Sequence, residues 1–240
     1  MLEALDASVL EANHCWFGGG TAIALTHGEY RESVDIDFLV SDLAGYRTLR
    51  QRTTGRHGIR AVTRDGARLE AAGDVRADQY GIRTWLTVDD IEIKLEIIHE
   101  ARIDLGPPLS TDRVCGIARL TKLDLAASKL LANSDRWADD VVYSRDLVDL
   151  AMMQLERKTL RTAIDKASGA YGASIERDLA RAVDALRRRA GRLDECMRAL
   201  RMLEVPAGVP PVPPALLWKQ IRRLDPTRAP RKRTAKRSGE

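Results

Sequence analysis

The stretch FGGGTAIALTHGEYRESVDIDFLV, residues 17–40, constrains the fold of this chain more than any other. Three glycines open a helical run, and an apolar strand at its end contains Asp35 and Asp37. Side chains two residues apart in a strand point to the same face, so the two carboxylates share one face. The alternate positions, which we expect to face the core, are Val34, Ile36, Phe38 and Val40. Two ionised carboxylates placed this close are unfavourable unless a cation lies between them.

The expected cation is Mg²⁺, or Mn²⁺ in its place. Mg²⁺ is usually bound by one or two carboxylates and completes its shell with phosphate oxygens and water. The glycines supply the complementary part, because a glycine-rich turn entering a helix offers backbone N–H groups and a positive helix end to phosphates. Neither a Walker motif nor a G-x-G-x-x-G is present. The stretch therefore predicts a triphosphate cradle followed by a metal-binding strand.

Each of these two elements also has a purely structural explanation. A run of glycines is most often a loop, and a lone D-x-D is most often the exposed edge of a strand. Their order along the chain, with a strand before the glycines and a helix between glycines and acids, favours a functional site.

Strand and helix patterns divide the chain. Up to about residue 105 they alternate, with strands expected at 15–17, 34–40, 81–88 and 91–98 and a helix at 44–52. From about 110 to 204 only helical spacing is found, and Thr111 and Ser144 are expected helix N-caps. The pattern predicts an α+β fold, a small mixed sheet followed by helices. We expect three parts: residues 1–109, residues 110–204, and a Pro-rich linker, short helix and basic tail at 205–240.

Composition narrows the class of protein. Hydrophobic residues make up 44% and charged residues 31%, which is typical of a globular domain, and no apolar run is long enough to cross a membrane. Cys15, Cys115 and Cys196 are scattered, and the four histidines show no zinc-binding spacing. We therefore expect a cytoplasmic protein without a disulfide framework.

The positive charge is concentrated at the end of the chain. Residues 228–240 hold six basic side chains and one acid, a net charge of +5 against +4 for the whole chain, so the preceding residues are nearly neutral. A basic tail favours acidic partners such as RNA. A solvated tail without a partner is the alternative.

The pattern in residues 17–40 resembles the nucleotidyltransferase superfamily and, more narrowly, the AbiEii/AbiGii-type toxins of type IV toxin–antitoxin systems. That family has GGT or GGS, then Arg and Ser, then DID and an aromatic or aliphatic residue. The matching positions are Gly19, Gly20, Thr21, Arg31, Ser33, Asp35, Asp37 and Phe38. The resemblance implies that Asp35 and Asp37 bind metal and act in catalysis. It also implies a nucleotide-binding set of Gly19, Gly20, Thr21, Arg31 and Ser33.

A third acid is expected on a neighbouring strand. In IEIKLEII, residues 91–98, the alternation places Glu92, Lys94 and Glu96 on one face. The family's second motif resembles Lys-x-Asp, which corresponds to Lys94 and Glu96 with Glu in place of Asp. The resemblance implies that Glu96 is a metal ligand, although Glu92 stays open as the third carboxylate. A salt-bridged exposed strand face is the alternative.

Two further motifs lie on expected helices. A-x-K-L-x-A matches residues 127–132 and implies that Lys129 contacts the nucleotide phosphates and belongs to the catalytic set. R-D-x-x-D-L matches residues 145–150 and implies that Asp146 orients the lysine or the nucleophile. Without the resemblance, a solvated helix lysine and a helix-start acid explain these residues equally well.

The resemblance implies a metal-dependent nucleotidyltransferase with a catalytic domain at residues 1–109 and a helical domain at 110–204 completing the cleft. Its substrate would be an NTP and its acceptor an RNA, with the 3′ end of tRNA as the expected site. Blocked translation and a cognate antitoxin would follow. Transfer to a protein side chain or a small molecule is the alternative enzyme, and a non-catalytic RNA-binding protein is the alternative of another class.

Overall fold

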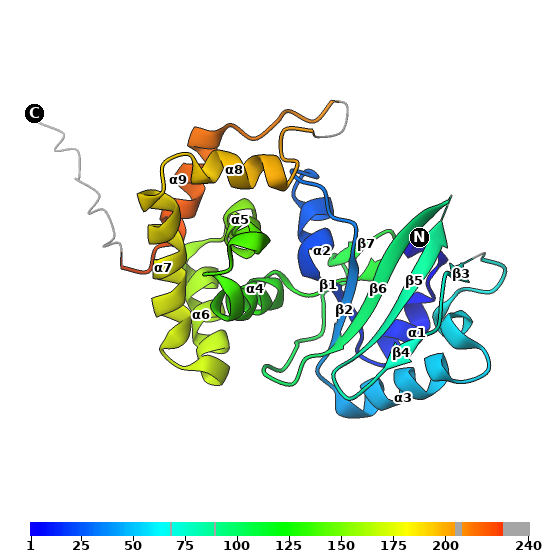
Figure 1. The fold of residues 1–240 in the computed structure, drawn as a ribbon. Coiled ribbons are helices and arrows are strands. Elements are labelled where there is room, and N and C mark those ends of the chain that lie inside the picture. The colour runs from blue at the N-terminus through cyan, green and yellow to red at the C-terminus, as the bar shows by residue number, and fades with distance from the viewer. Residues whose placement is uncertain (68, 89, 205–207, 228–240) are drawn as a thin grey trace, which may run out of the picture.

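The computed structural model describes residues 1–67, 69–88, 90–204 and 208–227. A mixed sheet forms the N-terminal part and a helical assembly the C-terminal part (Figure 1), which confirms the α+β fold class. The basic tail at 228–240 and part of the Pro-rich linker lie outside the described residues. In the described part of the chain, no helix is long and apolar enough to cross a membrane.

The large sheet has the order β1-β2-β6-β5-β3, and β4 also pairs with β5. Strands β2 and β6 are parallel, and the other pairs are antiparallel. The strands are β1 (Trp16–Gly18), β2 (Ile36–Val40), β3 (Glu70–Ala71), β4 (Arg76–Ala77), β5 (Gly81–Val88) and β6 (Ile91–His99). The expected strands at 81–88 and 91–98 are confirmed. Their register places Trp85 opposite Lys94 and Arg83 opposite Glu96.

The expectation that strands end before residue 110 is wrong. A small separate hairpin consists of β7 (Arg113–Val114) and β8 (Ile117–Ala118). Two-residue strands are too short for a side-chain period to be visible, so the sequence pattern gave no sign of them.

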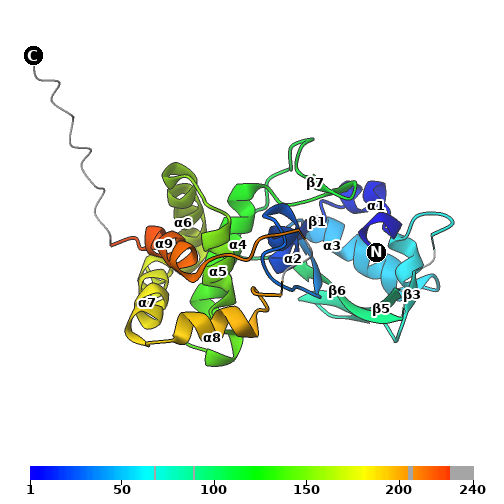
Figure 2. The ribbon, with the colours of Figure 1, turned by 90° about the horizontal axis from the view of Figure 1, so that it is seen from above.

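One face of the large sheet is covered by N-terminal helices (Figure 1; Figure 2), which are α1 (Ala7–Ala12) and α3 (Leu43–Thr54), with 3₁₀ turns η1 (Leu2–Ala4) and η2 (Gly58–Val62). The Asp42 side chain caps α3 by accepting hydrogen bonds from two backbone N–H groups of its first turn. The core on this face includes fully buried Phe17, Phe38, Leu49 and Leu86. Burial of these apolar side chains fixes which way the alternate positions of β2 and β6 point.

The helical part comprises α4 (Lys122–Arg136), η3 (Asp140–Val142), α5 (Arg145–Met152), α6 (Arg157–Tyr171), α7 (Ser174–Arg188), α8 (Arg192–Ala199) and α9 (Pro214–Leu224). Helix α4 packs against α5, α6 and α7. Its N-cap is Thr121, whose hydroxyl accepts from the Asp124 N–H, so the expected cap at Thr111 is wrong. Ser144 does occupy the N-cap position of α5, but its side chain makes no capping hydrogen bond.

Helix α2 (Gly19–Thr26) joins the two parts. It packs against β2 on one side and against α4 and α5 on the other. In addition, the Leu120 N–H donates to the Phe17 carbonyl at 2.8 Å, so the chain runs beside β1 directly before α4 begins. These contacts place α4 and α5 opposite the face of β2 that carries the acids.

Candidate active site

The glycine turn lies where β1 ends and α2 begins. Gly19 has φ +67°, a left-handed conformation that favours glycine, and a Cβ there would collide with the Asp37 carboxylate. A Cβ on Gly20 would collide with the Arg31 guanidinium. The two glycines thus permit a close approach between the start of the helix and the charged side chains around it.

The acids lie beside this turn. Asp37 is paired in register with Gly18 on one side and with Glu96 on the other. Asp35 directly precedes β2, which begins at Ile36, so the strand is shorter than expected. Val34, which we expected in the core, is 60% exposed. Pairing across β2 therefore starts only after the first acid.

A hydroxyl pair holds the segment before the strand. Thr21 Oγ1 lies 2.7 Å from Ser33 Oγ and also within hydrogen-bond distance of the Asp35 carbonyl oxygen. Because a carbonyl only accepts and Thr21 has one hydroxyl proton, Thr21 donates to Asp35 and accepts from Ser33. Thr21 and Ser33, both predicted to bind nucleotide, thus hold the segment that carries Asp35 and do not themselves line the cleft.

Glu96 is the third acid at this edge, and it is already paired. Its carboxylate accepts from Arg83 Nε at 2.9 Å and from Lys94 Nζ at 2.8 Å. Glu92, by contrast, is exposed and pairs in register with Thr87. Of the two acids that the sequence left open, Glu96 is therefore the one placed beside Asp37.

Negative charge accumulates around Asp37. Burial raises the pKa of its carboxyl to about 6, and the neighbouring Glu96 and Asp35 carboxylates act in the same direction. Lys129 and Lys94 oppose the rise without cancelling it. The two lysines therefore do not offset the combined effect of burial and the neighbouring carboxylates on Asp37.

Lys129 projects from α4 and is buried. Its Nζ lies 2.7 Å from Asp149 Oδ2 and 3.0 Å from Asp146 Oδ1. Burial acts to lower the pKa of Lys129, but the two carboxylates outweigh it and raise that pKa above its ordinary value. An ammonium has three N–H donors, so one remains beyond these two ion pairs.

Asp149 is the centre of the buried network. It is fully buried and accepts from Arg31 through Nε at 2.8 Å and through the second guanidinium nitrogen at 3.0 Å. The Tyr30 hydroxyl donates to it at 2.6 Å. Burial would raise the pKa of Asp149, yet Lys129 and Arg31 hold it below the ordinary value. Sequence reasoning missed Tyr30, because no short motif links it to a residue on α5.

Asp146 is the second acid of the network. Besides Lys129, it accepts from Arg136, with Nε at 2.7 Å and the second nitrogen at 2.9 Å. Burial acts to raise its pKa, but Lys129 and Arg136 lower it well below the ordinary range. The placement of Asp146 beside Lys129 is the one expected for a residue that orients the lysine.

These groups enclose a cleft of about 480 Å³ between β2, β6 and α4. The predicted site residues that line it are Gly19, Asp35, Asp37, Glu96 and Lys129. Those that lie outside its lining are Gly20, Thr21, Arg31, Ser33 and Asp146. Arg31 is bound to Asp149, so a direct contact of Arg31 with a nucleotide stays a prediction.

Three arginines of the cleft lie outside the catalytic and nucleotide-binding sets that the resemblance implies. Arg136 is held by Asp146, and Arg102 pairs with Glu100 at 2.7 Å and with Asp135 at 3.0 Å. Arg145 lines the cleft at the start of α5 and has no ion-pair partner within the part of the chain that the structure describes. The R-D-x-x-D-L motif contained a signal for Arg145, whereas nothing in the sequence indicated Arg102.

The donor atoms fit a divalent cation held by two carboxylates. Asp35 and Asp37 face the cleft, form no ion pair among the described residues, and lie where the charge is least balanced. No group of three or more His, Cys, Asp or Glu side chains is arranged to hold a metal within residues 1–67, 69–88, 90–204 and 208–227. Each oxygen of Glu96 already accepts from a cation, one from Arg83 and the other from Lys94, so a metal ion would compete with both ion pairs. A two-carboxylate site completed by phosphate and water suits Mg²⁺.

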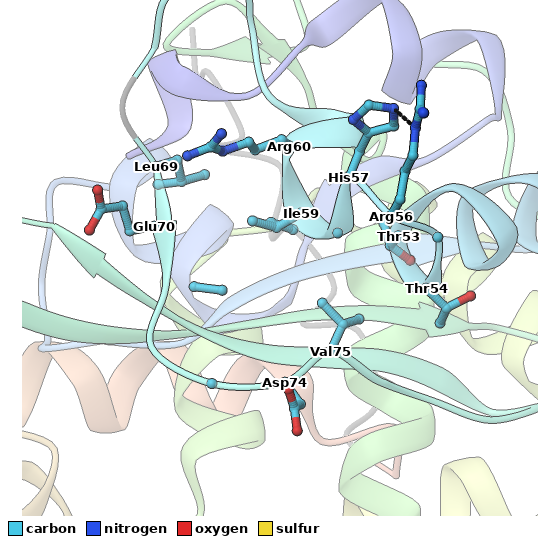
Figure 3. Close-up of a pocket in the computed structure, with 14 residues that line it drawn as sticks. Thr53, Thr54, Arg56, His57, Ile59, Arg60, Leu69, Glu70, Asp74 and Val75 are labelled. Carbon is cyan, nitrogen blue, oxygen red and sulfur yellow. Dashed lines mark hydrogen bonds between the residues drawn. The ribbon is translucent and has the colours of Figure 1, made fainter.

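A larger hollow of about 740 Å³ lies elsewhere, between the end of α3, η2 and the β3–β4 segment (Figure 3). Arg56, His57 and Arg60 line it together with Glu70 and Asp74. All five side chains are exposed. Because these five side chains are solvated, this hollow lacks the buried charged groups with shifted pKa values that distinguish the cleft.

The family model described as "Nucleotidyl transferase AbiEii toxin, Type IV TA system" matches residues 2–221. The chain therefore belongs to this family, and it is a nucleotidyltransferase of the type IV toxin–antitoxin class.

Two solved structures from Helicobacter pylori are similar to this chain. One is described as a nucleotidyltransferase and is 15% identical, with a TM-score of 0.47 and coverage of 91% of this chain and 89% of the other. The second is JHP933, also 15% identical, with a TM-score of 0.44 and coverage of 91% and 87%. A search of curated proteins finds no match.

Proposed function

We propose that this protein transfers a nucleoside monophosphate from an NTP to the 3′ end of an RNA, with tRNA as the acceptor, in a Mg²⁺-dependent reaction. The observation that carries the proposal is the cleft itself. Its strand wall bears Asp35 and Asp37, and its helix wall bears Lys129 and two arginines. Its volume of about 480 Å³ lies in the range of small-molecule sites.

The triphosphate would lie between the two walls. Gly19, the first residue of α2, lines the cleft, so the positive end of this helix lies beside it. The remaining N–H of Lys129 and the guanidinium of Arg145 supply positive charge from the other side. The ion pairs with Asp146 and Asp149 hold the Lys129 ammonium in place before substrate binds, so it needs little reorganisation.

In the reaction, the 3′ hydroxyl oxygen of the acceptor attacks the α-phosphorus. A new O–P bond forms, the bond between the α-phosphorus and the bridging oxygen breaks, and pyrophosphate leaves while the hydroxyl proton passes to solvent. Mg²⁺ held by Asp35 and Asp37, with Glu96 beside them, would neutralise charge on the phosphates and the attacking oxygen. The protein's own contribution is to align the reacting groups and to stabilise the charge on the leaving pyrophosphate.

An RNA acceptor accords with the class of the protein and with the sequence of its tail. The chain belongs to a toxin family, and six basic residues lie at 228–240. Modification of the tRNA 3′ end would block translation in the cytoplasm, and an antitoxin would be required to restrain it.

The test is direct transfer. Full-length protein, Mg²⁺ and each α-labelled NTP in turn are incubated with total tRNA, beside the Asp37→Asn variant and a reaction with EDTA. We expect label on RNA with the wild-type protein and Mg²⁺, and none in either control.

Label on protein instead of RNA would replace the RNA acceptor by a protein side chain. Failure of all four nucleotides to bind would overturn the catalytic proposal. RNA binding without NTP binding would indicate the non-catalytic alternative.

A further inference from the structure

The face of the sheet that carries the acids continues beyond the cleft. Asp37 is paired with Glu96, Glu96 with Arg83, and Trp85 with Lys94. Residues that are paired across strands, or two apart along one strand, share a face. Trp85 therefore lies on the same face as the acids, one strand further out than the cleft residue Lys94.

Trp85 stands out by its exposure. The indole is 49% exposed, whereas its neighbours in β5, Thr84 and Leu86, are 3% and 0% exposed on the opposite face. Helices α1 and α3 cover that opposite face (Figure 1; Figure 2). A single exposed apolar side chain is common on protein surfaces, so the case for a ligand depends on the side chains beside the indole.

Basic side chains accompany the indole toward the cleft. Lys94 is its cross-strand partner, Arg83 is two residues before it, and exposed Arg76 of β4 is paired with Arg83. Lys94 and Arg83 both pair with Glu96, and Arg83 also pairs with Asp78 at 3.3 Å, so the three basic side chains Arg76, Arg83 and Lys94 accompany two acids. The acids Glu70 and Glu92 lie beside Thr87, on the side of Trp85 away from the cleft. On the cleft side of Trp85, basic side chains therefore outnumber Glu96 and Asp78 by one, whereas the residues beyond Trp85 that flank Thr87 are acids.

We propose that this platform, defined as Trp85, Arg76, Arg83 and Lys94, binds the single-stranded 3′ segment of the acceptor RNA. A base stacks on Trp85, and the basic side chains hold the phosphates between that base and the terminal hydroxyl. This inference rests on the RNA acceptor proposed above, and it adds where the acceptor lies.

The spacing suits such a strand. From Asp37 to Trp85 the path crosses two strand spacings and two residues along the strand, roughly 12 Å in all. That separation spans a few stacked nucleotides, whose rise is about 3.4 Å each along a strand. Proteins read single-stranded RNA ends mainly by stacking bases on aromatic rings beside basic side chains. Because this sheet face is continuous with the cleft in which the 3′ hydroxyl would react, the acceptor strand is the occupant that it favours.

The first experiment measures binding without turnover. A short single-stranded RNA, labelled at its 5′ end and with an intact 3′ hydroxyl, is titrated with full-length protein in the absence of NTP, and anisotropy is recorded. We compare wild type with Trp85→Ala, Trp85→Leu and Trp85→Phe. Leu keeps apolar bulk without an aromatic face, and Phe keeps the face.

We expect Trp85→Ala and Trp85→Leu to weaken RNA binding about 10-fold or more, as loss of one base–aromatic stack does, and Phe to restore most of it. Arg76→Glu should weaken binding and flatten its salt dependence. Nucleotide affinity, measured separately, should be unchanged in all variants. Because Trp85 and Arg76 are exposed, these variants should fold as wild type, which circular dichroism checks.

Several results would overturn the platform. One is wild-type RNA affinity in Trp85→Ala; another is loss of NTP binding in place of RNA binding, which would assign the indole to the incoming base. Loss of self-association in Trp85→Ala, with RNA binding intact, would make the face an interface between copies.

Transfer assays separate the two proposals. If wild type transfers label to RNA and Trp85→Ala does so with an unchanged KM for RNA, the platform fails and the proposed function stands. If wild type transfers nothing, yet RNA binding depends on the aromatic face at position 85, the platform stands and the proposed function fails.

Discussion

The carboxylates on the two sides of the cleft differ in whether they have ion-pair partners. On the helix side, Asp146 and Asp149 are buried. They form ion pairs with three cations and accept a hydrogen bond from a tyrosine hydroxyl. On the strand wall, Asp35 and Asp37 form no ion pair among the described residues, and the pKa of Asp37 is raised to about 6. A buried network in which every carboxylate is paired fixes the positions of its side chains. Carboxylates without an ion-pair partner at an open cleft are suited to binding a cation. We therefore expect substitutions of the buried acids to affect mainly stability and substitutions of the strand acids to affect mainly activity.

The largest effect should come from the strand wall. Replacing Asp37 by Asn removes the charge that would hold Mg²⁺, and we expect transfer to fall about 10⁴-fold, near 5 kcal/mol in the barrier. Stability should not fall, because an unfavourable buried charge is removed. Single-turnover transfer and urea unfolding test the two statements. A variant that unfolds at a lower urea concentration than wild type would show instead that Asp37 stabilises the fold.

The helix wall should respond in stability. Asp149→Ala leaves Arg31 and Lys129 buried without their shared carboxylate, and we expect the free energy of unfolding to drop by about 3–5 kcal/mol. Urea unfolding followed by circular dichroism measures it. The matched control is Asp165→Ala on α6, whose carboxylate is exposed and makes only a long pair with Arg161. Equal stability of both variants would show that the buried network contributes nothing.

The same network should give a smaller, graded effect of pH. Because Asp146 and Asp149 have pKa values below those of an unfolded chain, near 3.9, the folded state binds their protons less tightly. Their contribution is fully present above about pH 4 and is lost as pH falls below it. The part of the unfolding free energy that these two acids contribute should be constant from pH 7 to about pH 4. It should then decline as the pH is lowered to 2.5. A variant lacking Asp149 should decline less steeply over the same interval.

Glu96 lies on the strand wall but is ion-paired like the acids of the helix wall. Its substitution should therefore give the smallest effect on activity of the strand-wall acids. The Glu96 carboxylate is already balanced by Arg83 and Lys94. We expect Glu96→Gln to reduce transfer about 10-fold, far less than Asp37→Asn. A loss as large as that of Asp37→Asn would show that Glu96 leaves its ion pairs and binds the metal directly.

Local patterns predicted much of the fold. The strands at 81–88 and 91–98, the helix after the glycines and the helical character of the second half all follow from side-chain periodicity. The pattern failed where it had no length to act on, as in the β7–β8 hairpin. It also placed Val34 in the core, because alternation continues past the residue where strand pairing starts.

The candidate site divides in the same manner. Gly19, Asp35 and Asp37 could be proposed from spacing, since the turn and the strand are neighbours in sequence. Arg102 could not, because its place in the cleft depends on how the chain leaves β6 and meets α4. Lys129 was found through a motif, and the resemblance implied Asp146 as a residue that could orient it, but nothing in the sequence indicated the ion pair with Asp149.

The sequence by itself determined that two carboxylates share a strand face beside a glycine turn, because a side-chain period of two and the conformational freedom of glycine are local properties. Only the tertiary structure decided which acid joins them: parallel pairing of β2 with β6 sets Glu96 beside Asp37 and leaves Glu92 in solvent. It also brought Tyr30 to Asp149, 119 positions away along the chain. Such contacts depend on which surfaces bury one another, and that choice is made by the packing of the whole chain.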